Sequence, residues 1–119
     1  MIVAPWNLTM AVYCFDLDNT LCKTECSDGR HCYLEATPIK ERIAVVNQLY
    51  DQGHIILIET SRGCGSGVNW FQDTVKQLVG WGVRFHTVRA GVKFAADFYI
   101  DDKAINSEDF FKVPVESRP

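Results

Sequence analysis

Two short, unbroken apolar segments constrain the fold more than any other feature of this chain. Residues 11–15 read AVYCF and residues 55–58 read IILI, and polar residues follow each segment directly. Short apolar runs rich in β-branched and aromatic residues are typical of buried strands. Strands that are apolar throughout are expected where both faces of a sheet are covered. Both segments are therefore predicted to be core strands.

Helical patterns alternate with the predicted strands. A first helix is expected after Pro38, with apolar residues at helical spacing from Ile39 to Tyr50 and a stop at Gly53. The remaining expected elements are a helix from Phe71 to about Gly80, strands at 83–88 and 98–100, and a last helix at 104–111. Alternating strands and helices imply parallel pairing through right-handed crossovers. The prediction is α/β: a three-layer α/β/α sandwich with a central parallel sheet, a single domain spanning 1–119.

Composition narrows the function classes. The 119 residues suit one domain, and residues 1–9 add nothing to the strand and helix pattern, so they are predicted to be a non-core extension. The chain has no signal-peptide pattern and no apolar run long enough to span a bilayer, which predicts a soluble cytoplasmic protein. A net charge of −3 without a basic stripe argues against nucleic acid. Five cysteines, an odd number, predict reduced thiols, with Cys14 in the core.

Polar residues with complementary chemistry follow the predicted strands. In an open parallel sheet, ligands bind beyond the carboxyl ends of the strands. Carboxylates clustered at that edge repel one another unless a cation neutralises them, and oxygen ligands suit Mg²⁺. A metal, a lysine and a hydroxyl together indicate a phosphoryl-transfer site. The residues expected at this edge are Asp16, Asp18, Thr60, Ser61, Arg62, Lys93, Asp101 and Asp102.

The spacing of Asp16 and Asp18 fits two different tasks. A carboxylate at the end of a strand can attack phosphorus and form an acyl phosphate. A carboxyl group two residues later can protonate the leaving oxygen and then activate water. Thr20 would order the turn that follows.

These segments resemble the four motifs of the haloacid dehalogenase (HAD) superfamily, in order along the chain. FDLDNTL at 15–21 resembles the first motif, ILIETSR at 56–62 the second, Lys93 the third and YIDD at 99–102 the acidic fourth. The chain is also similar to small HAD proteins known as capsule biosynthesis phosphatases. They share DxDGTLC, PIKERI, TxRG and YIDDKAINSEDFF-like patterns.

The resemblance implies a role for each matching residue. Asp16 would be the nucleophile and a Mg²⁺ ligand, and Asp18 the general acid/base with its main-chain oxygen on the metal. Thr60 would bind the transferring phosphoryl group, and Lys93 would offset its charge. Asp101 and Asp102 would hold Mg²⁺, one directly and the other either directly or through water. Asn19 stands where the family usually has glycine, and Phe94 where proline is frequent.

Plainer interpretations stay open beside these roles. Thr60 could simply cap a helix, and Lys93 could be a surface residue, with Lys103 as the alternative cation. The glycines after the second strand could serve only to form a turn, in which case Ser61, Arg62 and Gly63 would not contact the substrate. The polar segment 22–37 is predicted to be a flap or loop. Its potential ligands match no standard zinc spacing, and Trp70 could pack on the sheet or line the substrate entrance. Those ligands are Cys22, Cys26, His31 and Cys32.

The sequence therefore predicts a Mg²⁺-dependent phosphomonoester phosphatase with an aspartyl-phosphate intermediate. The gaps between motifs, about 40 and about 30 residues, leave no room for a large cap domain. An open site could admit a bulky substrate, or a partner subunit, as in a homo-oligomer, could close it. The family likeness suggests a phosphorylated sugar from capsule or surface-polysaccharide synthesis. The alternatives are a nucleic-acid 3′-phosphatase, a dehalogenase, for which Asp18 would be superfluous, and a non-catalytic phospholigand-binding module.

Overall fold

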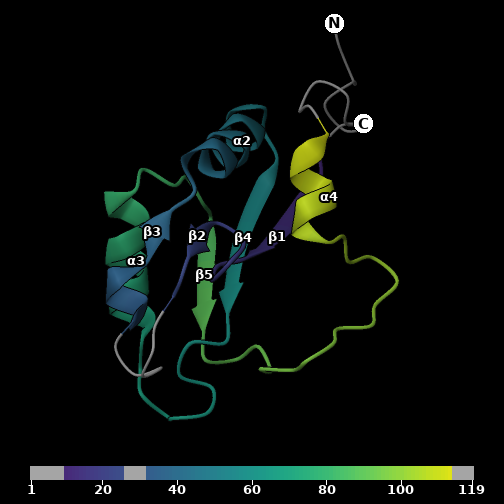
Figure 1. Cartoon of the computed structure of the whole chain (residues 1–119). Helices are drawn as coiled ribbons and strands as arrows, with labels where there is room; N and C mark the ends of the chain where they lie inside the picture. The colour runs from purple at the N-terminus through teal and green to yellow at the C-terminus, as the bar shows by residue number, and fades with distance from the viewer. Residues whose placement is uncertain (1–9, 26–31, 114–119) are drawn as a thin grey trace, which may run out of the picture.

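A three-stranded parallel sheet forms the centre of the molecule. The computed structural model describes residues 10–25 and 32–113, and the sheet has the order β1-β4-β5 (Figure 1). Its strands are β1 (Val12–Asp16), β4 (Ile55–Thr60) and β5 (Thr87–Ala90). Parallel pairing places Asp16 opposite Glu59, and Thr60 opposite Ala90. The carboxyl ends of all three strands therefore meet at one edge, as predicted.

Two helices make the crossovers between the strands. Helix α2 (Lys40–Asp51) joins β1 to β4, and α3 (Phe71–Gly80) joins β4 to β5. Both predicted helices are confirmed, although α2 begins later than expected because Pro38 belongs to the short strand β3 (Thr37–Pro38). The last helix, α4 (Ser107–Lys112), starts at a cap in which the Asn106 side chain accepts a hydrogen bond from the Glu108 main-chain N–H.

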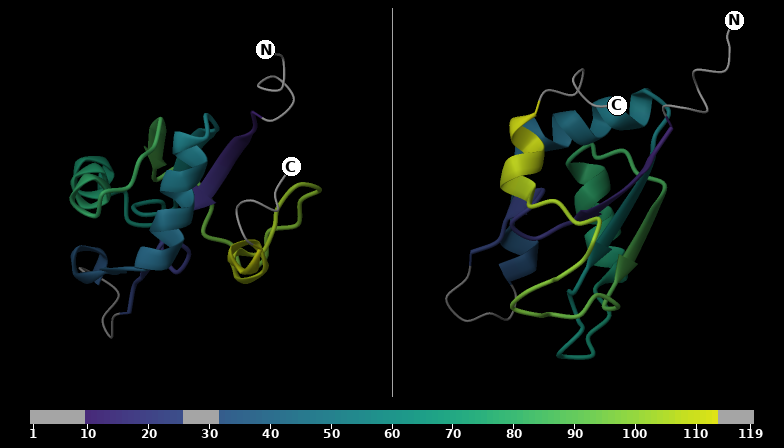
Figure 2. Two further views of the ribbon diagram at one scale, coloured as in Figure 1. Left: turned by 90° about the horizontal axis from the view of Figure 1, so that it is seen from above. Right: turned by 90° about the vertical axis from the view of Figure 1, so that its right-hand side faces the viewer.

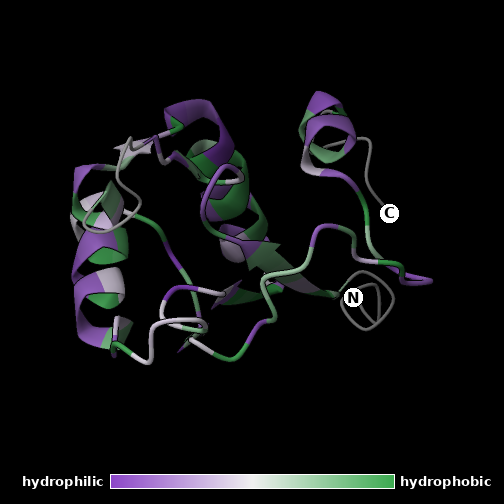
Figure 3. Cartoon of the chain, turned by 60° about the horizontal axis from the view of Figure 1, so that its bottom comes forward, coloured by the Kyte–Doolittle hydropathy of each residue, from purple (hydrophilic) through white to green (hydrophobic). Residues whose placement is uncertain are grey.

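All three of these α-helices lie on the same side of the sheet. Figure 2 shows β1, β4 and β5 on one side and the three helices on the other. Figure 3 shows hydrophilic positions along one side of α2 and α3 and hydrophobic positions along the other. One buried cluster joins the covered sheet face to the helices. Its members include Phe15, Ile56, Ile58 and Val88 from the strands, Ile43, Val46 and Leu49 from α2, Leu78 from α3 and Phe110 from α4.

The opposite face of the sheet has no helix over it among the described residues. Its side chains alternate with the buried ones, and Val12, Cys14, Thr87 and Arg89 are exposed. The α/β class with a parallel sheet is confirmed, but the predicted third layer is not. The prediction that Cys14 is a core residue is wrong for the same reason: it lies on the uncovered face.

The predicted strands after α3 differ from those observed. Strand β5 starts at Thr87 rather than at Val83, although the Val83 side chain is buried. The strand expected at 98–100 does not form: residues 91–106 run in a wide, irregular arc from β5 to α4 (Figure 1). In that segment Phe98 is 84% exposed and Ile100 is 98% exposed. An apolar segment forms a strand only where a neighbouring strand pairs with it, and in the described part of the chain β1 and β5 remain the edges of the sheet.

The described part of the predicted flap is a short ladder and one helical turn. Strand β2 (Cys22–Lys23) pairs antiparallel with β3, and a 3-10 turn, η1 (Cys32–Glu35), precedes β3. Cys32 is disulfide-bonded, so the prediction that every thiol is reduced is wrong. The proposed extension at 1–9 and the ligands Cys26 and His31 lie outside the described residues. No described helix is long and apolar enough to cross a membrane.

Candidate active site

The turn after β1 presents two carboxylates on a rigid base. The side chains of Leu17 and Leu21 are fully buried, and the main-chain N–H of Leu21 donates to the Leu17 carbonyl oxygen at 2.8 Å. These anchors leave Asp16 and Asp18 facing the carboxyl edge of the sheet. Asn19 has a φ of 63°, a left-handed conformation that asparagine and glycine adopt more readily than other residues. Asparagine therefore suits the backbone conformation of this turn.

Asp16 lies at the end of β1 beside a lysine from a distant segment. Its side chain is 35% exposed, and its Oδ1 is 3.2 Å from Nζ of Lys93. The Thr20 hydroxyl is 3.4 Å from the other carboxylate oxygen, in position to donate. The ring of Tyr99 lies 4.5 Å from the Lys93 ammonium, a cation–π contact. The structure thus brings Lys93 to Asp16 from a segment far away in sequence.

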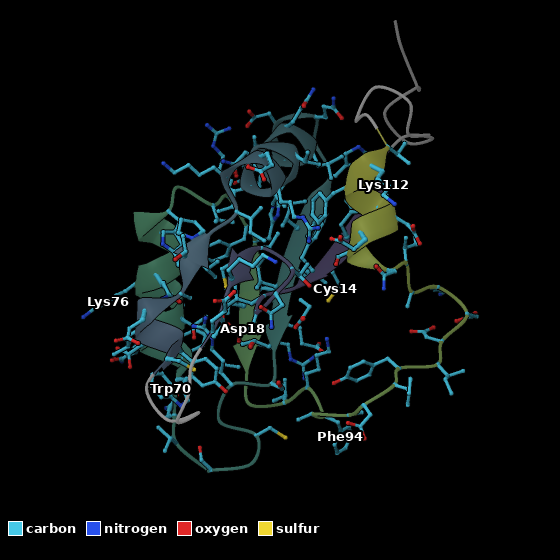
Figure 4. All side chains as sticks on the ribbon, in the orientation of Figure 1. Cys14, Asp18, Trp70, Lys76, Phe94 and Lys112 are labelled. Atoms are coloured by element: carbon cyan, nitrogen blue, oxygen red, sulfur yellow. The ribbon has the colours of Figure 1, made fainter. Side chains whose placement is uncertain are left out.

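Asp18 is bound by Arg62 in a two-point ion pair. Nε of Arg62 donates to Oδ2 of Asp18 at 2.9 Å, and a terminal guanidinium nitrogen donates to Oδ1 at 2.7 Å. The hydroxyl of Thr24 also donates to Oδ1, at 2.6 Å. Figure 4 labels Asp18, which lies between α3 and the carboxyl ends of the strands. The Asp18 side chain keeps 22% of its surface exposed, so water reaches the carboxylate.

The rest of the Arg62 side chain is held by the protein. The Arg62 side chain is 1% exposed, and the remaining terminal nitrogen of its guanidinium donates to the side-chain oxygens of Gln77 at 2.8 Å and Thr74 at 3.3 Å, both on α3. The Tyr33 ring covers it at 4.8 Å. Every nitrogen of the guanidinium therefore has a protein partner. This placement does not support the prediction that Arg62 contacts the substrate.

These contacts keep Asp18 ionised. Burial by itself raises the pKa of Asp18, but the hydrogen bonds from Arg62 and Thr24 and the charge of Arg62 outweigh that effect, so the net pKa of Asp18 is lowered. The neighbouring Cys22 responds in the opposite direction: burial is the main reason that the pKa of its thiol is raised. At neutral pH, Asp18 is a hydrogen-bond acceptor and Cys22 is a neutral thiol.

The strand beside Asp16 ends in the predicted second motif. Thr60 is 1% exposed, and its hydroxyl accepts a hydrogen bond from the Arg62 main-chain N–H at 3.2 Å. Ser61 is partly exposed at the same edge. Gly63 has a φ of 87°, and a Cβ at that position would lie 2.2 Å from the carbonyl oxygen of Val68. Only glycine fits there, which favours a turn role for Gly63 over a substrate contact. Trp70 is buried and packs edge-on against Tyr33, 5.1 Å between ring centres.

The acidic pair of the predicted fourth motif stands apart from the other carboxylates. Asp101 and Asp102 are exposed on the segment 91–106. The pKa of Asp101 is lowered, chiefly by the hydrogen bond that the main-chain N–H of Lys103 donates to its carboxylate. Within residues 10–25 and 32–113, no three His, Cys, Asp or Glu side chains gather closely enough to hold a metal ion. The structure brings Asp16, Asp18, Thr60 and Lys93 to one edge, and it does not bring the acidic pair to them.

The residues that hold Arg62 are not among those predicted from the sequence. Thr74 is fully buried on α3 among apolar neighbours, and Gln77 follows it by one helical turn. A polar pair on the inward face of a helix is a signal for a buried partner, but it does not identify which one. Thr24 carried no such signal, because it belongs to a polar segment.

Comparisons with known proteins bear on the fold alone. No protein-family model matches the chain, and no curated protein matches it in sequence. The chain is similar in structure to a structural-genomics target from Vibrio cholerae, known from a crystal structure, with a TM-score of 0.75 and 24% sequence identity. The similarity covers 91% of this chain and 93% of that one. The described α/β arrangement therefore recurs in an experimentally determined protein over nearly its full length.

Proposed function

We propose that the chain is a phosphomonoester phosphatase that works through an aspartyl-phosphate on Asp16. The observation that supports this most directly is the surroundings of Asp16: a partly exposed carboxylate at a strand end, 3.2 Å from a lysine ammonium and adjacent to a second, ionised carboxylate. Parallel pairing brings Thr60 to the same edge. A nucleophile, a cation, a hydroxyl and an acid/base group are the components that the two-step reaction requires.

In the first step an Asp16 carboxylate oxygen attacks phosphorus. A new oxygen–phosphorus bond forms to Asp16, the ester bond breaks, and the leaving oxygen takes a proton from Asp18, which must first take that proton from solvent because it is ionised in the resting site. Lys93 offsets the charge of the transferring group and must exchange its contact with Asp16 for one with the phosphoryl oxygens. In the second step water attacks the acyl phosphate, Asp18 accepts its proton, and inorganic phosphate leaves as the Asp16 carboxylate is restored.

Magnesium is part of the proposal. The carboxylate of Asp16 and the main-chain oxygen of Asp18 are oxygen donors of the kind that Mg²⁺ prefers, and Mg²⁺ needs few protein ligands because water and phosphate complete its coordination. When bound, Mg²⁺ supplies positive charge to the phosphoryl group. Asp101 or Asp102 would join these ligands if the segment 91–106 moves toward Asp16, to which Lys93 of the same segment already extends.

The substrate class follows from the resemblance to capsule biosynthesis phosphatases. It favours a phosphorylated sugar or sugar derivative. The acidic balance of the chain disfavours a nucleic-acid 3′-phosphate, and a binding module without catalysis is the non-enzymatic alternative.

The test is Mg²⁺-dependent phosphate release across sugar phosphates, nucleotides, 3′-phosphorylated oligonucleotides and p-nitrophenyl phosphate. Asp16→Asn should abolish release, and Asp51→Asn is the matched control, since Asp51 is an exposed carboxylate on α2 that pairs with Arg84. Turnover confined to sugar phosphates would support the assigned class. Turnover that survives Asp16→Asn would refute the mechanism, and Mg²⁺ binding without turnover on any substrate would favour the binding module.

A further inference from the structure

The buried guanidinium of Arg62 has no role in the steps described so far. It lies behind Asp18 rather than in the open part of the site, and its exposed fraction is only 1%. Proteins rarely bury a charged side chain unless it is paired and hydrogen-bonded, and Arg62 meets both conditions. Its two contacts with Asp18, at 2.9 and 2.7 Å, engage both oxygens of that carboxylate. A two-point contact fixes the rotation of a carboxylate as well as its position.

We propose that Arg62 is a positioning residue that fixes the Asp18 carboxylate for the attack of water on the aspartyl-phosphate, and that it is not a substrate-binding residue. The inference rests on the proposed function. The observation that supports it is independent of that function, because the contacts of Arg62 do not depend on whether Asp16 acts as a nucleophile.

The contacts behind Arg62 make it a rigid support. Gln77 accepts from Arg62 at 2.8 Å, and its own amide donates to the Tyr33 main-chain oxygen at 2.5 Å. Asp18 is thereby connected through Arg62 to α3 and to the 3-10 turn. Lysine could keep the positive charge, but it lacks the planar fork that binds both carboxylate oxygens and Gln77 together.

The contacts at Asp18 favour the second step of the reaction. Oδ1 accepts from Arg62, Thr24 and the Cys22 thiol, whereas Oδ2 accepts from Nε of Arg62. An oxygen held in this way can accept the proton of the attacking water while a bond forms from that water to phosphorus and the bond from phosphorus to Asp16 breaks. A displaced Asp18 would slow this step more than the first step on a substrate whose leaving group needs no proton.

The kinetic test uses p-nitrophenyl phosphate, whose leaving group departs without an acid. In Arg62→Lys, kcat should fall about 10²-fold, the scale expected for a catalytic group displaced by about 1 Å. KM should fall with it, so that kcat/KM drops much less, and stopped-flow traces should show a stoichiometric burst of nitrophenolate as the phosphoenzyme accumulates. The matched control Arg84→Lys, at an exposed ion pair, should show neither change. A raised KM without a burst would overturn the inference, because that is the result expected of a substrate-binding arginine.

A second variant guards against misfolding of Arg62→Lys. Gln77→Met keeps the length of the side chain and removes the acceptor behind Arg62, and it should give the same burst with a smaller fall in kcat. An unchanged kcat in Gln77→Met, together with an unchanged kcat in a folded Arg62→Lys, would refute the positioning role.

An NMR measurement separates this inference from the proposed function. The Nε–H resonance of Arg62 should shift in Asp18→Asn and should stay in place when inorganic phosphate is added to the wild-type protein. The reverse pattern would overturn the inference whether or not the protein turns over a substrate. Absence of turnover that depends on Asp16 would refute the proposed function and leave the NMR result to decide on Arg62.

Discussion

Replacing Asp18 by asparagine should destabilise the fold as well as impair the site. The substitution keeps the shape of the side chain but removes the only counter-ion that the described residues give to Arg62. In place of one of the two carboxylate oxygens, asparagine also presents an NH₂ group to the guanidinium. The protein must then hold a positive charge that is 1% exposed without a neutralising partner.

The size of the effect follows from how each partner is buried. Removing one member of a buried ion pair costs about 3–5 kcal/mol, because the other charge is stranded. Asp18 keeps 22% of its surface exposed and water can partly replace it, so we expect the lower end, about 3 kcal/mol. Domains have total stabilities of about 5–15 kcal/mol. The change is therefore large enough to shift the unfolding midpoint clearly.

Urea unfolding followed by circular dichroism measures the effect, with stability taken from linear extrapolation. The decisive control is a double-mutant cycle with Arg62→Met. Methionine removes the buried charge, so in that background Asp18→Asn should cost about 1 kcal/mol or less, the cost of an ordinary hydrogen bond. If Asp18→Asn costs the same in both backgrounds, the buried guanidinium is not the reason for the loss and the reasoning is wrong.

Three further outcomes are expected. The pKa of Asp18 is lowered in the folded protein, so its contribution to stability is fully present above the unfolded pKa of about 3.9 and is lost as the pH falls through the folded pKa. In urea unfolding, the difference in unfolding free energy between wild type and Asp18→Asn should therefore be constant from pH 7 to 5 and should narrow below about pH 4. Lys93→Met should lower kcat/KM for phosphate release by about 10²–10³-fold, the usual cost of losing one charge-stabilising group, and an unchanged value would point to Lys103 instead. Phe110→Ala should cost about 3–5 kcal/mol in thermal or urea unfolding, because this ring is 8% exposed and packs against Tyr13 and Phe15; a cost below about 1 kcal/mol would show that α4 is not part of the core.

The sequence was sufficient to predict the elements that depend on local pattern. The strands at 12–16 and 55–60 come from unbroken apolar runs and the helices α2 and α3 from apolar residues at helical spacing. The structure has all four within a few residues of the predicted bounds. The parallel order also follows from the alternation of strand and helix. These features predict where Asp16, Asp18 and Thr60 lie, because each follows a strand directly.

Features that depend on distant partners could not be predicted in this way. The segment Phe98–Ile100 has a strand-like composition, but it has no pairing partner among the residues that the structure describes and remains exposed. The uncovered face of the sheet could not be predicted for the same reason, because the apolar runs of the strands do not show how many helices cover them. The role of Arg62 is the clearest case: its motif suggests a substrate contact, and only its burial and its bonds to α3 show that the protein itself uses the side chain.

The position of β1 in the sheet has a consequence for local opening. Strand β4 is hydrogen-bonded on both sides, whereas within residues 10–25 and 32–113 β1 is bonded to β4 alone. Amide protons in the middle of β4 should therefore exchange with solvent only when the whole domain opens, and those of β1 through smaller and more frequent fluctuations. Asp16 ends the less protected strand. A ligand that binds at this carboxyl edge should slow hydrogen exchange in β1 more than in β4, so that exchange rates report occupancy of the site even where no reaction takes place.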